Sequence, residues 1–165
     1  MNKVYLLTGG NVGNRQQFLG ETAGLIGASA GKIMRQSALY ETAPWGNTLQ
    51  EPFLNQALEI LTPLAAQPLL TCLLGIEAEL GRTRTTRYAA RTIDIDILLF
   101  NGEIIKTDSL TIPHPEMASR KFVLEPLAEI AGDLLHPVYG ITIGALLAQC
   151  TDPLPVKKFS APEII

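Results

Sequence analysis

Residues 91–100 read RTIDIDILLF, a segment whose apolar run from residue 93 onward is interrupted only by Asp94 and Asp96. A short apolar run of this kind, rich in isoleucine and leucine, predicts an interior strand. Side chains alternate across a strand, so two faces are expected. One face should carry Asp94, Asp96, Leu98 and Phe100, and the other Ile93, Ile95, Ile97 and Leu99. Carboxylates in such a buried strand are unfavourable unless a positive charge meets them.

The spacing of the two aspartates indicates what that charge could be. Alternate residues of a strand place their Cα atoms roughly 6.5–7 Å apart on one side. Two carboxylates at that separation repel unless a cation lies between them. Mg²⁺ suits the pair because it binds through one or two carboxylates and completes its shell with phosphate oxygens and water. A pair of ordinary salt bridges to nearby arginines is the alternative.

The segment just before this strand is basic. Residues 81–91 read GRTRTTRYAAR and place Arg82, Arg84, Arg87 and Arg91 between a predicted helix and the strand. Arginine forks match phosphate oxygens in pairs, so carboxylates beside these arginines predict a metal–polyphosphate site. A solvated basic loop is the alternative interpretation.

Shorter stretches give weaker signals. The segment TGGNVGN at 8–14 lacks the Lys-Ser/Thr pair of a P-loop, so a glycine-rich turn between strand and helix is the better interpretation. His114 lies between two prolines, which could hold its imidazole in place. Phe53 and Asn55 share one face of an extended segment, which suits a flat heterocycle with donor and acceptor edges. A core phenylalanine and a turn-capping asparagine remain the alternative.

The order of expected elements indicates the fold class. Strands are expected at 4–8, 32–40, 53–61 and 91–100, long helices at 14–29 and 68–80, and short helices at 124–131 and 142–148. This order predicts an α+β ferredoxin-like sandwich, with an antiparallel sheet and helices packed mainly on one face. The connections 41–52, 82–92 and 101–121 are longer than a small domain needs, so we expect them to form the active site.

Composition sets broad limits on the protein. A length of 165 residues fits one domain, 1–165, with a proline-containing irregular tail at 152–165. The net charge of −3 does not indicate binding to nucleic acid or to a membrane surface, and no run approaches the roughly 20 apolar residues of a membrane span. Cys72 and Cys150 are isolated, which is typical of a reduced protein, so a cytoplasmic location is expected.

Two dense stretches, GRTRTTRYAARTIDIDILLF at 81–100 and IPHPEMASRKFVLEPL at 112–127, resemble the 6-hydroxymethyl-7,8-dihydropterin pyrophosphokinase family of folate biosynthesis. The resemblance extends over residues 3–131. It implies a ferredoxin-like fold, ATP bound with two Mg²⁺ ions, and transfer of the β,γ-diphosphate to the pterin hydroxymethyl group with release of AMP. ATP and 6-hydroxymethyl-7,8-dihydropterin would therefore be the small-molecule partners.

The resemblance also implies roles for individual residues. Asp94 and Asp96 would hold both ions, and Arg82 and Arg91 would stabilise the transferring charge. ATP would be bound by Arg82, Arg84, Arg91, Ile97, Thr111, His114 and Arg120. The pterin would be bound by Thr42, Ala43, Pro44, Trp45, Phe53, Asn55, Tyr88, Asp94 and Phe122, with Phe53 and Phe122 on either side of its ring. Glu77 would face the same site, although its helix position also allows surface exposure.

The sequence departs from the family pattern outside the metal and arginine set. Tyr88 stands where many members have tryptophan, Thr85 where lysine is common, and Gly10 where serine is usual. Pro115 follows the histidine where some members have an aromatic residue, and Trp45 replaces a smaller apolar residue. Two other activities remain open at this point: a different metal-dependent nucleotidyl or phosphoryl transferase, and a non-catalytic ligand sensor.

Overall fold

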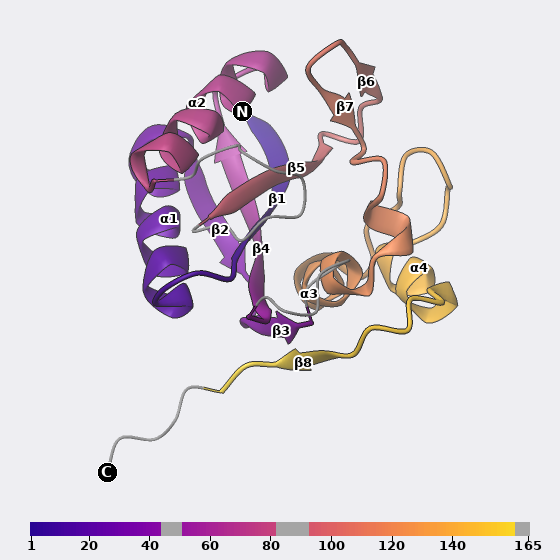
Figure 1. Ribbon diagram of the computed structural model, residues 1–165. Coiled ribbons are helices and arrows are strands. Elements are labelled where there is room, and N and C mark those ends of the chain that lie inside the picture. The colour runs from indigo at the N-terminus through magenta and orange to yellow at the C-terminus, as the bar shows by residue number, and fades with distance from the viewer. Residues whose placement is uncertain (44–50, 82–92, 161–165) are drawn as a thin grey trace.

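The computed structural model describes residues 1–43, 51–81 and 93–160 (Figure 1). Within these ranges the elements follow one another as β1 (Asn2–Gly10), α1 (Arg15–Ser29), β2 (Lys32–Gln36), β3 (Tyr40–Thr42), β4 (Phe53–Thr62), α2 (Ala66–Glu79), β5 (Asp94–Phe100), β6 (Ile105–Lys106), β7 (Thr111–Ile112), a 3₁₀ helix (Met117–Ser119), α3 (Lys121–Ala131), α4 (Ile143–Gln149) and β8 (Val156–Lys158). Each strand and helix expected from the sequence is present, with shifted ends. No helix in the described ranges is both long and apolar enough to cross a bilayer.

The main sheet is antiparallel throughout. Its strands lie in the order β5-β1-β4-β3-β8, and β2 also pairs with β4. The two central strands, β1 and β4, pair along their whole shared length, from Asn2 opposite Thr62 to Gly10 opposite Leu54. The connection 101–121, expected as a long loop, contains the small β6-β7 hairpin and the 3₁₀ helix.

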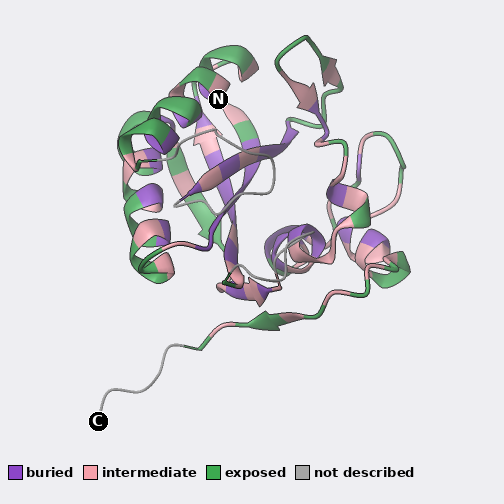
Figure 2. Cartoon of the chain, in the orientation of Figure 1, coloured by how far each residue is buried: buried purple, intermediate pink, exposed green. Residues whose placement is uncertain are grey.

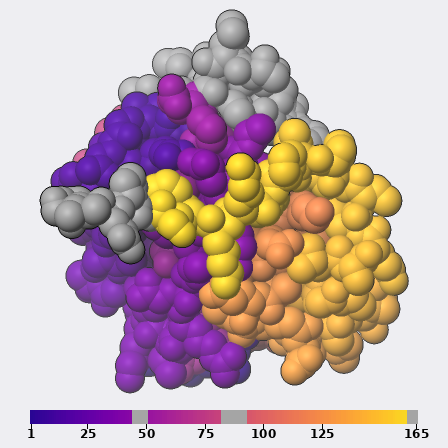
Figure 3. All heavy atoms as spheres, turned by 90° about the horizontal axis from the view of Figure 1, so that it is seen from below, coloured from indigo at the N-terminus to yellow at the C-terminus, as the bar shows by residue number. Residues whose placement is uncertain are grey.

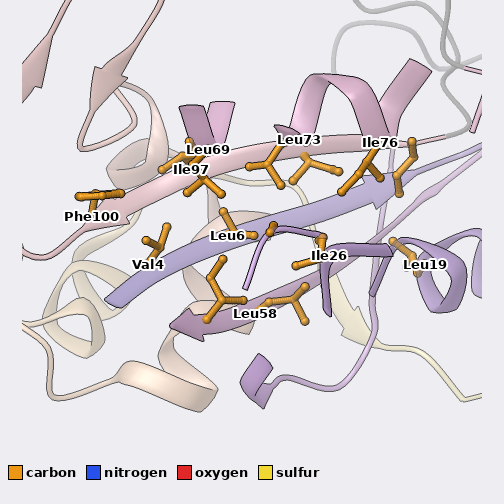
Figure 4. Close-up of a cluster of buried hydrophobic side chains, with 14 of the residues drawn as sticks. Val4, Leu6, Leu19, Ile26, Leu58, Leu69, Leu73, Ile76, Ile97 and Phe100 are labelled. Atoms are coloured by element: carbon orange, nitrogen blue, oxygen red, sulfur yellow. The ribbon is translucent and has the colours of Figure 1, made fainter. Parts of the chain in front are cut away.

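One face of the sheet is covered by α1 and α2. Leu19 and Ile26 of α1 and Leu69 and Leu73 of α2 pack against alternate residues of the strands, such as Leu6 (Figure 4). The apolar residues of α2 recur at helical spacing, so one stripe of that helix is buried while its outer side faces solvent (Figure 2). This packing forms the larger hydrophobic cluster.

The opposite face is also covered, which corrects the expectation that helices pack mainly on one face. α3 and α4 pack there against Tyr5, Leu7 and Ala57, and the buried residues of α3 include Leu124 and Leu127 (Figure 1). The strands present apolar side chains on both faces, so a second layer of helices is needed to bury the second set. The sheet therefore lies between two helical layers.

A β-bulge changes the faces expected for β5. Leu99 pairs with Tyr5 and Ile97 with Leu6, so Leu98 has no opposite residue in β1. The extra residue reverses the alternation beyond it. Phe100 consequently packs in the α1/α2 cluster with Ile97, and Leu99 packs with Leu98 in the α3/α4 cluster. Asp94 and Asp96 precede the bulge and keep the shared face that the sequence predicted.

The tail expected to be irregular contains a strand. β8 pairs with β3, with Val156 opposite Thr42 and Lys158 opposite Tyr40. The prolines at 153 and 155 precede β8, so they remove no backbone donor from it. The free edge of the short strand β3 is therefore paired by the C-terminal segment.

Candidate active site

One row of residues crosses four strands on the α3 side of the sheet. Tyr40 of β3 lies opposite Asn55 of β4, Asn55 lies opposite Gly9 of β1, and Gly9 lies opposite Asp94 of β5. Cross-strand partners point to the same face, and neighbouring strands lie about 4.8 Å apart. The Cα atoms of Asn55 and Asp94 are thus about 10 Å apart, with only a glycine between them. Asp96, opposite Leu7, occupies the next row on the same face.

Gly9 leaves room for the side chain of Asn55. A Cβ atom at Gly9 would lie 2.1 Å from Asn55 Oδ1 and 3.1 Å from the backbone oxygen of Leu54. The first contact is closer than real Cβ atoms show, so any side chain at Gly9 would displace the carboxamide of Asn55, which is only 5% exposed. Glycine inside a strand often marks such a close approach. Gly9 is therefore buried beneath the Asn55 carboxamide, between that amide and the carboxylate of Asp94.

Thr42 and Phe53 form a neighbouring pair on the same face. They lie opposite each other in β3 and β4. The hydroxyl group of Thr42 is buried, with the residue 3% exposed, and has no hydrogen-bond partner in the structure as described. A buried hydroxyl without a partner is destabilising by about 1–3 kcal/mol, which a polar ligand could remove. Phe53 beside it is half-buried and offers an aromatic surface.

His114 and Arg120, in the connection between β7 and α3, and Phe122, in α3, approach the same face. The backbone N–H of His114 donates to the carbonyl oxygen of Leu98 at 3.0 Å, which fixes the histidine beside β5. Its Nδ1 atom accepts from the N–H of Glu116 at 3.3 Å, and the carboxylate of Glu116 pairs with Arg120. The guanidinium of Arg120 lies 5.7 Å from the ring centre of Phe122.

Charges around His114 link it to the carboxylates of β5. Burial and the Arg120 guanidinium lower the pKa of His114 below its ordinary value, while Glu116 and Asp94 oppose that shift. The pKa of His114 therefore responds to the charges of both Arg120 and Asp94, two residues that the sequence predicted for the same site.

Asp94 and Asp96 are half-buried rather than fully buried, so a ligand can reach them. Within the described ranges no cluster of three or more His, Cys, Asp or Glu side chains is suited to hold an ion. The donor set that remains is a pair of carboxylates on one face, which fits Mg²⁺ completed by phosphate and water better than an ion held by protein alone. Gly9 itself is buried, so such ligands would reach the pair from the exposed parts of the two aspartates.

Glu77 is neither a surface residue nor part of this face. It is 3% exposed, and its Oε2 atom accepts a hydrogen bond from the N–H of Ile95 at 2.7 Å. Ile95 packs in the α1/α2 cluster, so Glu77 holds the peptide between the two aspartates from the opposite side of the sheet. Its position four residues after Leu73, on the buried stripe of α2, was the signal in the sequence.

The remaining predicted site residues either lie away from this row or fall outside the described residues. The side chain of Ile97 packs in the α1/α2 cluster, so an ATP contact of Ile97 on the site face would have to come from its backbone. The bulge lies beyond it, so Ile97 keeps the face opposite the aspartates. Thr111 is half-buried in β7 opposite Lys106, and Ala43 is half-buried just after β3. Pro44, Trp45, Arg82, Arg84, Tyr88 and Arg91 lie outside the described residues.

Sequence reasoning missed Gly9 and Tyr40. Gly9 was included only in a glycine-rich turn, although a glycine that ends an apolar strand can indicate a close approach. Tyr40 donates a hydrogen bond from its hydroxyl to Glu129 Oε1 of α3 at 2.6 Å, which joins the row to the helix above it. The turn itself is as expected: Gly13 has a φ of 67°, and Asn14 accepts from the N–H of Gln17 to begin α1.

Comparison with known proteins identifies relatives over most of the chain. A family model described as 7,8-dihydro-6-hydroxymethylpterin-pyrophosphokinase (HPPK) matches residues 5–132. The chain is 47% identical over 130 residues to the 2-amino-4-hydroxy-6-hydroxymethyldihydropteridine pyrophosphokinase of Bacillus subtilis (strain 168), covering 78% of each chain. A relative of the same name from Methylorubrum extorquens is 40% identical over 159 residues, covering 96% of this chain and 99% of the relative.

Solved structures agree with the fold. The structure of wild-type Plasmodium falciparum HPPK-DHPS with pteroate matches with a TM-score of 0.75 at 19% identity, covering 90% of this chain and 42% of that one. At this identity the likeness shows the fold alone, whereas the sequence relatives carry the family. A match over residues 5–132 and relatives named pyrophosphokinases at 40–47% identity show that this chain is an enzyme of the 7,8-dihydro-6-hydroxymethylpterin-pyrophosphokinase family.

Proposed function

We propose that this enzyme transfers the β,γ-diphosphate of ATP to 6-hydroxymethyl-7,8-dihydropterin, releasing AMP, as a step of folate biosynthesis. The observation that carries the proposal is the row Asn55–Gly9–Asp94, which sets a carboxamide and a carboxylate on one face of the sheet with a glycine between them. A flat heterocycle bound at Asn55 would extend its hydroxymethyl group across Gly9 toward Asp94. The match to relatives named pyrophosphokinases supports the same reaction.

The pterin would be recognised at the Asn55 end of the row. The carboxamide of Asn55 offers both a donor and an acceptor, which suits the edge of a pterin. The buried hydroxyl of Thr42 would gain a partner there, assisted by backbone groups around Ala43, Pro44 and Trp45. Phe53 and Phe122 would stack on the two faces of the ring, with Tyr88 at its edge.

The diphosphate would lie at the Asp94 end. Asp94 and Asp96 would hold two Mg²⁺ ions. When bound, Mg²⁺ supplies neutralisation of the phosphate charge and a lower pKa for the attacking hydroxyl group. The carboxylates themselves would orient the phosphates for in-line attack, since positioning and charge complementarity provide most of the acceleration in this class of reaction.

Basic groups would hold the rest of ATP. His114 accepts a hydrogen bond at Nδ1 from the Glu116 N–H, so its neutral ring carries its hydrogen at Nε2. The Nε2–H group would donate a hydrogen bond to a phosphate oxygen. Arg120 would add a charged donor beside it. Arg82, Arg84 and Arg91 would bind the triphosphate, and Arg82 and Arg91 would stabilise the charge that develops during transfer. Thr111 and the backbone of Ile97 would complete the nucleotide contacts.

The strand order supports the finer fold assignment. β1, β2, β4 and β5 lie in the order β5-β1-β4-β2, and α1 and α2 connect them across one face. This is the arrangement of a ferredoxin-like sandwich, to which α3, α4 and β8 add a second layer and an extra strand.

Product analysis tests the proposal. The protein is incubated with MgATP and 6-hydroxymethyl-7,8-dihydropterin, and the products are identified by mass spectrometry. AMP and a pterin diphosphate are expected, and both should be absent without the pterin, with EDTA in excess, or with Asp96→Asn. ADP would instead indicate a kinase, and inorganic pyrophosphate a nucleotidyl transferase. Binding of ATP that yields no product and is unaffected by Asp96→Asn would indicate a sensor.

A further inference from the structure

Arg15, the first residue of α1, joins two strands that lead into the candidate site. Its NH1 atom donates to Glu41 Oε2 of β3 at 2.8 Å and to the carbonyl oxygen of Pro52, just before β4, also at 2.8 Å. Nearby, Asn11 Nδ2 donates to the carbonyl oxygen of Glu51 at 3.0 Å, which joins the end of β1 to the same segment before β4. One guanidinium therefore fixes the end of β3 relative to the start of β4.

The residues that Arg15 holds are direct neighbours of the proposed pterin contacts. Glu41 precedes Thr42, and Pro52 precedes Phe53. Side chains alternate along a strand, so Glu41 points to the α1 side of the sheet and Thr42 to the α3 side. Arg15 thus acts on the Thr42–Phe53 pair through its neighbours and touches neither of them.

The C-terminal segment covers this contact. The ring of Phe159 lies 5.5 Å from the Arg15 guanidinium carbon, and the Phe159 N–H donates to the carbonyl oxygen of Leu39 at 2.8 Å. Figure 3 shows the segment lying across this side of the molecule. The side chains of Arg15 and Glu41 are 22% and 32% exposed, so water screens their pairing only in part. β8 and Phe159 lie beyond residues 5–132, the range matched by the family model.

We infer that Arg15, covered by Phe159, is a positioning residue that sets the separation of Thr42 and Phe53 and thereby the affinity for the pterin. The inference rests on the proposed function. β3 has three residues, which pair with β4 and β8, and the Arg15 contacts add a side-chain restraint between its end and the start of β4. A guanidinium that donates hydrogen bonds to both segments restricts their relative movement. The affinity for a ring bound between Thr42 and Phe53 is sensitive to displacements well below 1 Å.

The chain supplies a closely matched control in Arg35. Arg35 also pairs with one carboxylate, Glu59 at 3.5 Å, and donates to one backbone carbonyl, that of Ile130 at 3.0 Å. It joins β2 to β4 through Glu59 and to α3 through Ile130, its side chain is 64% exposed, and within the described ranges its hydrogen bonds and ion pairs do not involve β3 or residues 51–53. Arg35→Gln removes the same charge and the same kinds of contact, away from the pterin side.

The experiment compares Arg15→Gln, Arg35→Gln and the unaltered enzyme. KM is measured for the pterin and for ATP, and pterin affinity is measured by calorimetry with Mg²⁺ and a non-hydrolysable ATP analogue. For Arg15→Gln we expect KM and Kd of the pterin to rise about tenfold, while KM for ATP stays within about twofold. Arg35→Gln should leave both substrates within about twofold. Phe159→Ala, which keeps the hydrogen bonds of Arg15, should raise the pterin values about threefold.

Several results would overturn the inference. These are an unchanged pterin Kd in Arg15→Gln, an equal rise of both KM values, or the same pterin effect in Arg35→Gln. If Arg15→Gln does not fold, an unchanged pterin Kd in Phe159→Ala decides against it. An unaltered enzyme that forms no AMP would overturn the proposed function itself, which separates that failure from the failure of the Arg15 role.

Discussion

On the α3 side of the sheet, the position of a side chain depends on the space and the hydrogen-bond partners that its neighbours provide. Asn55 can turn its carboxamide over β1 because Gly9 has no side chain, and the Thr42 hydroxyl is buried beside it without a partner in the described chain. Without a ligand, the unpartnered Thr42 hydroxyl is unfavourable, and the position of the Asn55 carboxamide has no evident structural use. Both become useful when a polar, flat ligand occupies the row, which is why they point to a binding site.

Gly9→Ala tests the close approach of the Asn55 carboxamide to Gly9. Its Cβ would lie 2.1 Å from Asn55 Oδ1, so the carboxamide must move. We expect kcat/KM for the pterin to fall at least about tenfold, with KM for ATP little changed, as measured by initial rates. Gly24→Ala is the control, because nothing lies within 4 Å of its added Cβ, and it should leave both values unchanged. Equal behaviour of the two variants would contradict the role of Gly9.

His136 gives a pH-dependent prediction remote from the site. Its Nδ1 atom accepts from the N–H groups of Val138 and Tyr139 at 3.2 and 3.3 Å, so only the neutral ring fits. Burial lowers the pKa of His136, so the unfolded chain binds the proton more readily. The stability it contributes is therefore present above about pH 6.5 and is lost as the pH falls toward the lower folded value.

His136→Asn should remove that dependence, because the Asn oxygen can accept the same hydrogen bonds without titrating. Urea denaturation between pH 7.5 and 5 measures the free energy of unfolding of both proteins. The unaltered protein should lose more stability over this range than the variant does. Parallel curves for the two proteins would show that His136 does not titrate as described.

At the scale of elements, β5 is the edge strand that carries Asp94 and Asp96. The bulge in β5 turns Phe100 into the larger hydrophobic cluster. On the outer edge of β5, the Ile95 N–H donates a hydrogen bond to Glu77 of α2. An edge strand exposes backbone donors unless another element covers them. The segment Asp94–Ile95–Asp96 is thus held by β1 on one side and by α2 on the other.

Glu77→Ala removes the acceptor of the buried Ile95 N–H. Hydrogen bonds to charged groups contribute about 1.5–3 kcal/mol, so we expect a loss of about 2 kcal/mol in the free energy of unfolding, measured by urea denaturation. Glu77→Gln keeps an acceptor oxygen and should lose less. Glu79→Ala, an exposed position at the end of the same helix, is the control. A stability of Glu77→Ala equal to that of the control would refute this anchoring.

At the scale of the whole molecule, local periodicity predicted the elements better than their assembly. The helical spacing of Leu69, Leu73 and Ile76 and the apolar run of β5 are properties of short segments, so α2 and β5 were found correctly. The second helical layer was missed because it depends on which face each strand presents, and the bulge near Leu98 leaves no mark in composition. β8 was missed because its partner, β3, lies more than 100 residues away in the chain.

The candidate site shows the same difference between local sequence patterns and contacts across the fold. Asp94, Asp96, Asn55 and His114 were predicted as site residues because their residue types and motifs are local properties of the sequence. Gly9, Glu77 and Arg15 act through distances between separate elements, and such distances cannot be read from a linear pattern.

The central claim is that Asp94 and Asp96 bind the ions that neutralise the phosphates of ATP beside a pterin held at Asn55. A crystal structure of the complex with Mg²⁺, a non-hydrolysable ATP analogue and the pterin alcohol tests it most directly. Oxygen atoms of both aspartates should lie about 2.1 Å from Mg²⁺ ions that also contact phosphate oxygens, with the pterin hydroxymethyl group pointing toward Asp94. Aspartates turned away from any ion, or bound only to arginine side chains, would contradict the claim.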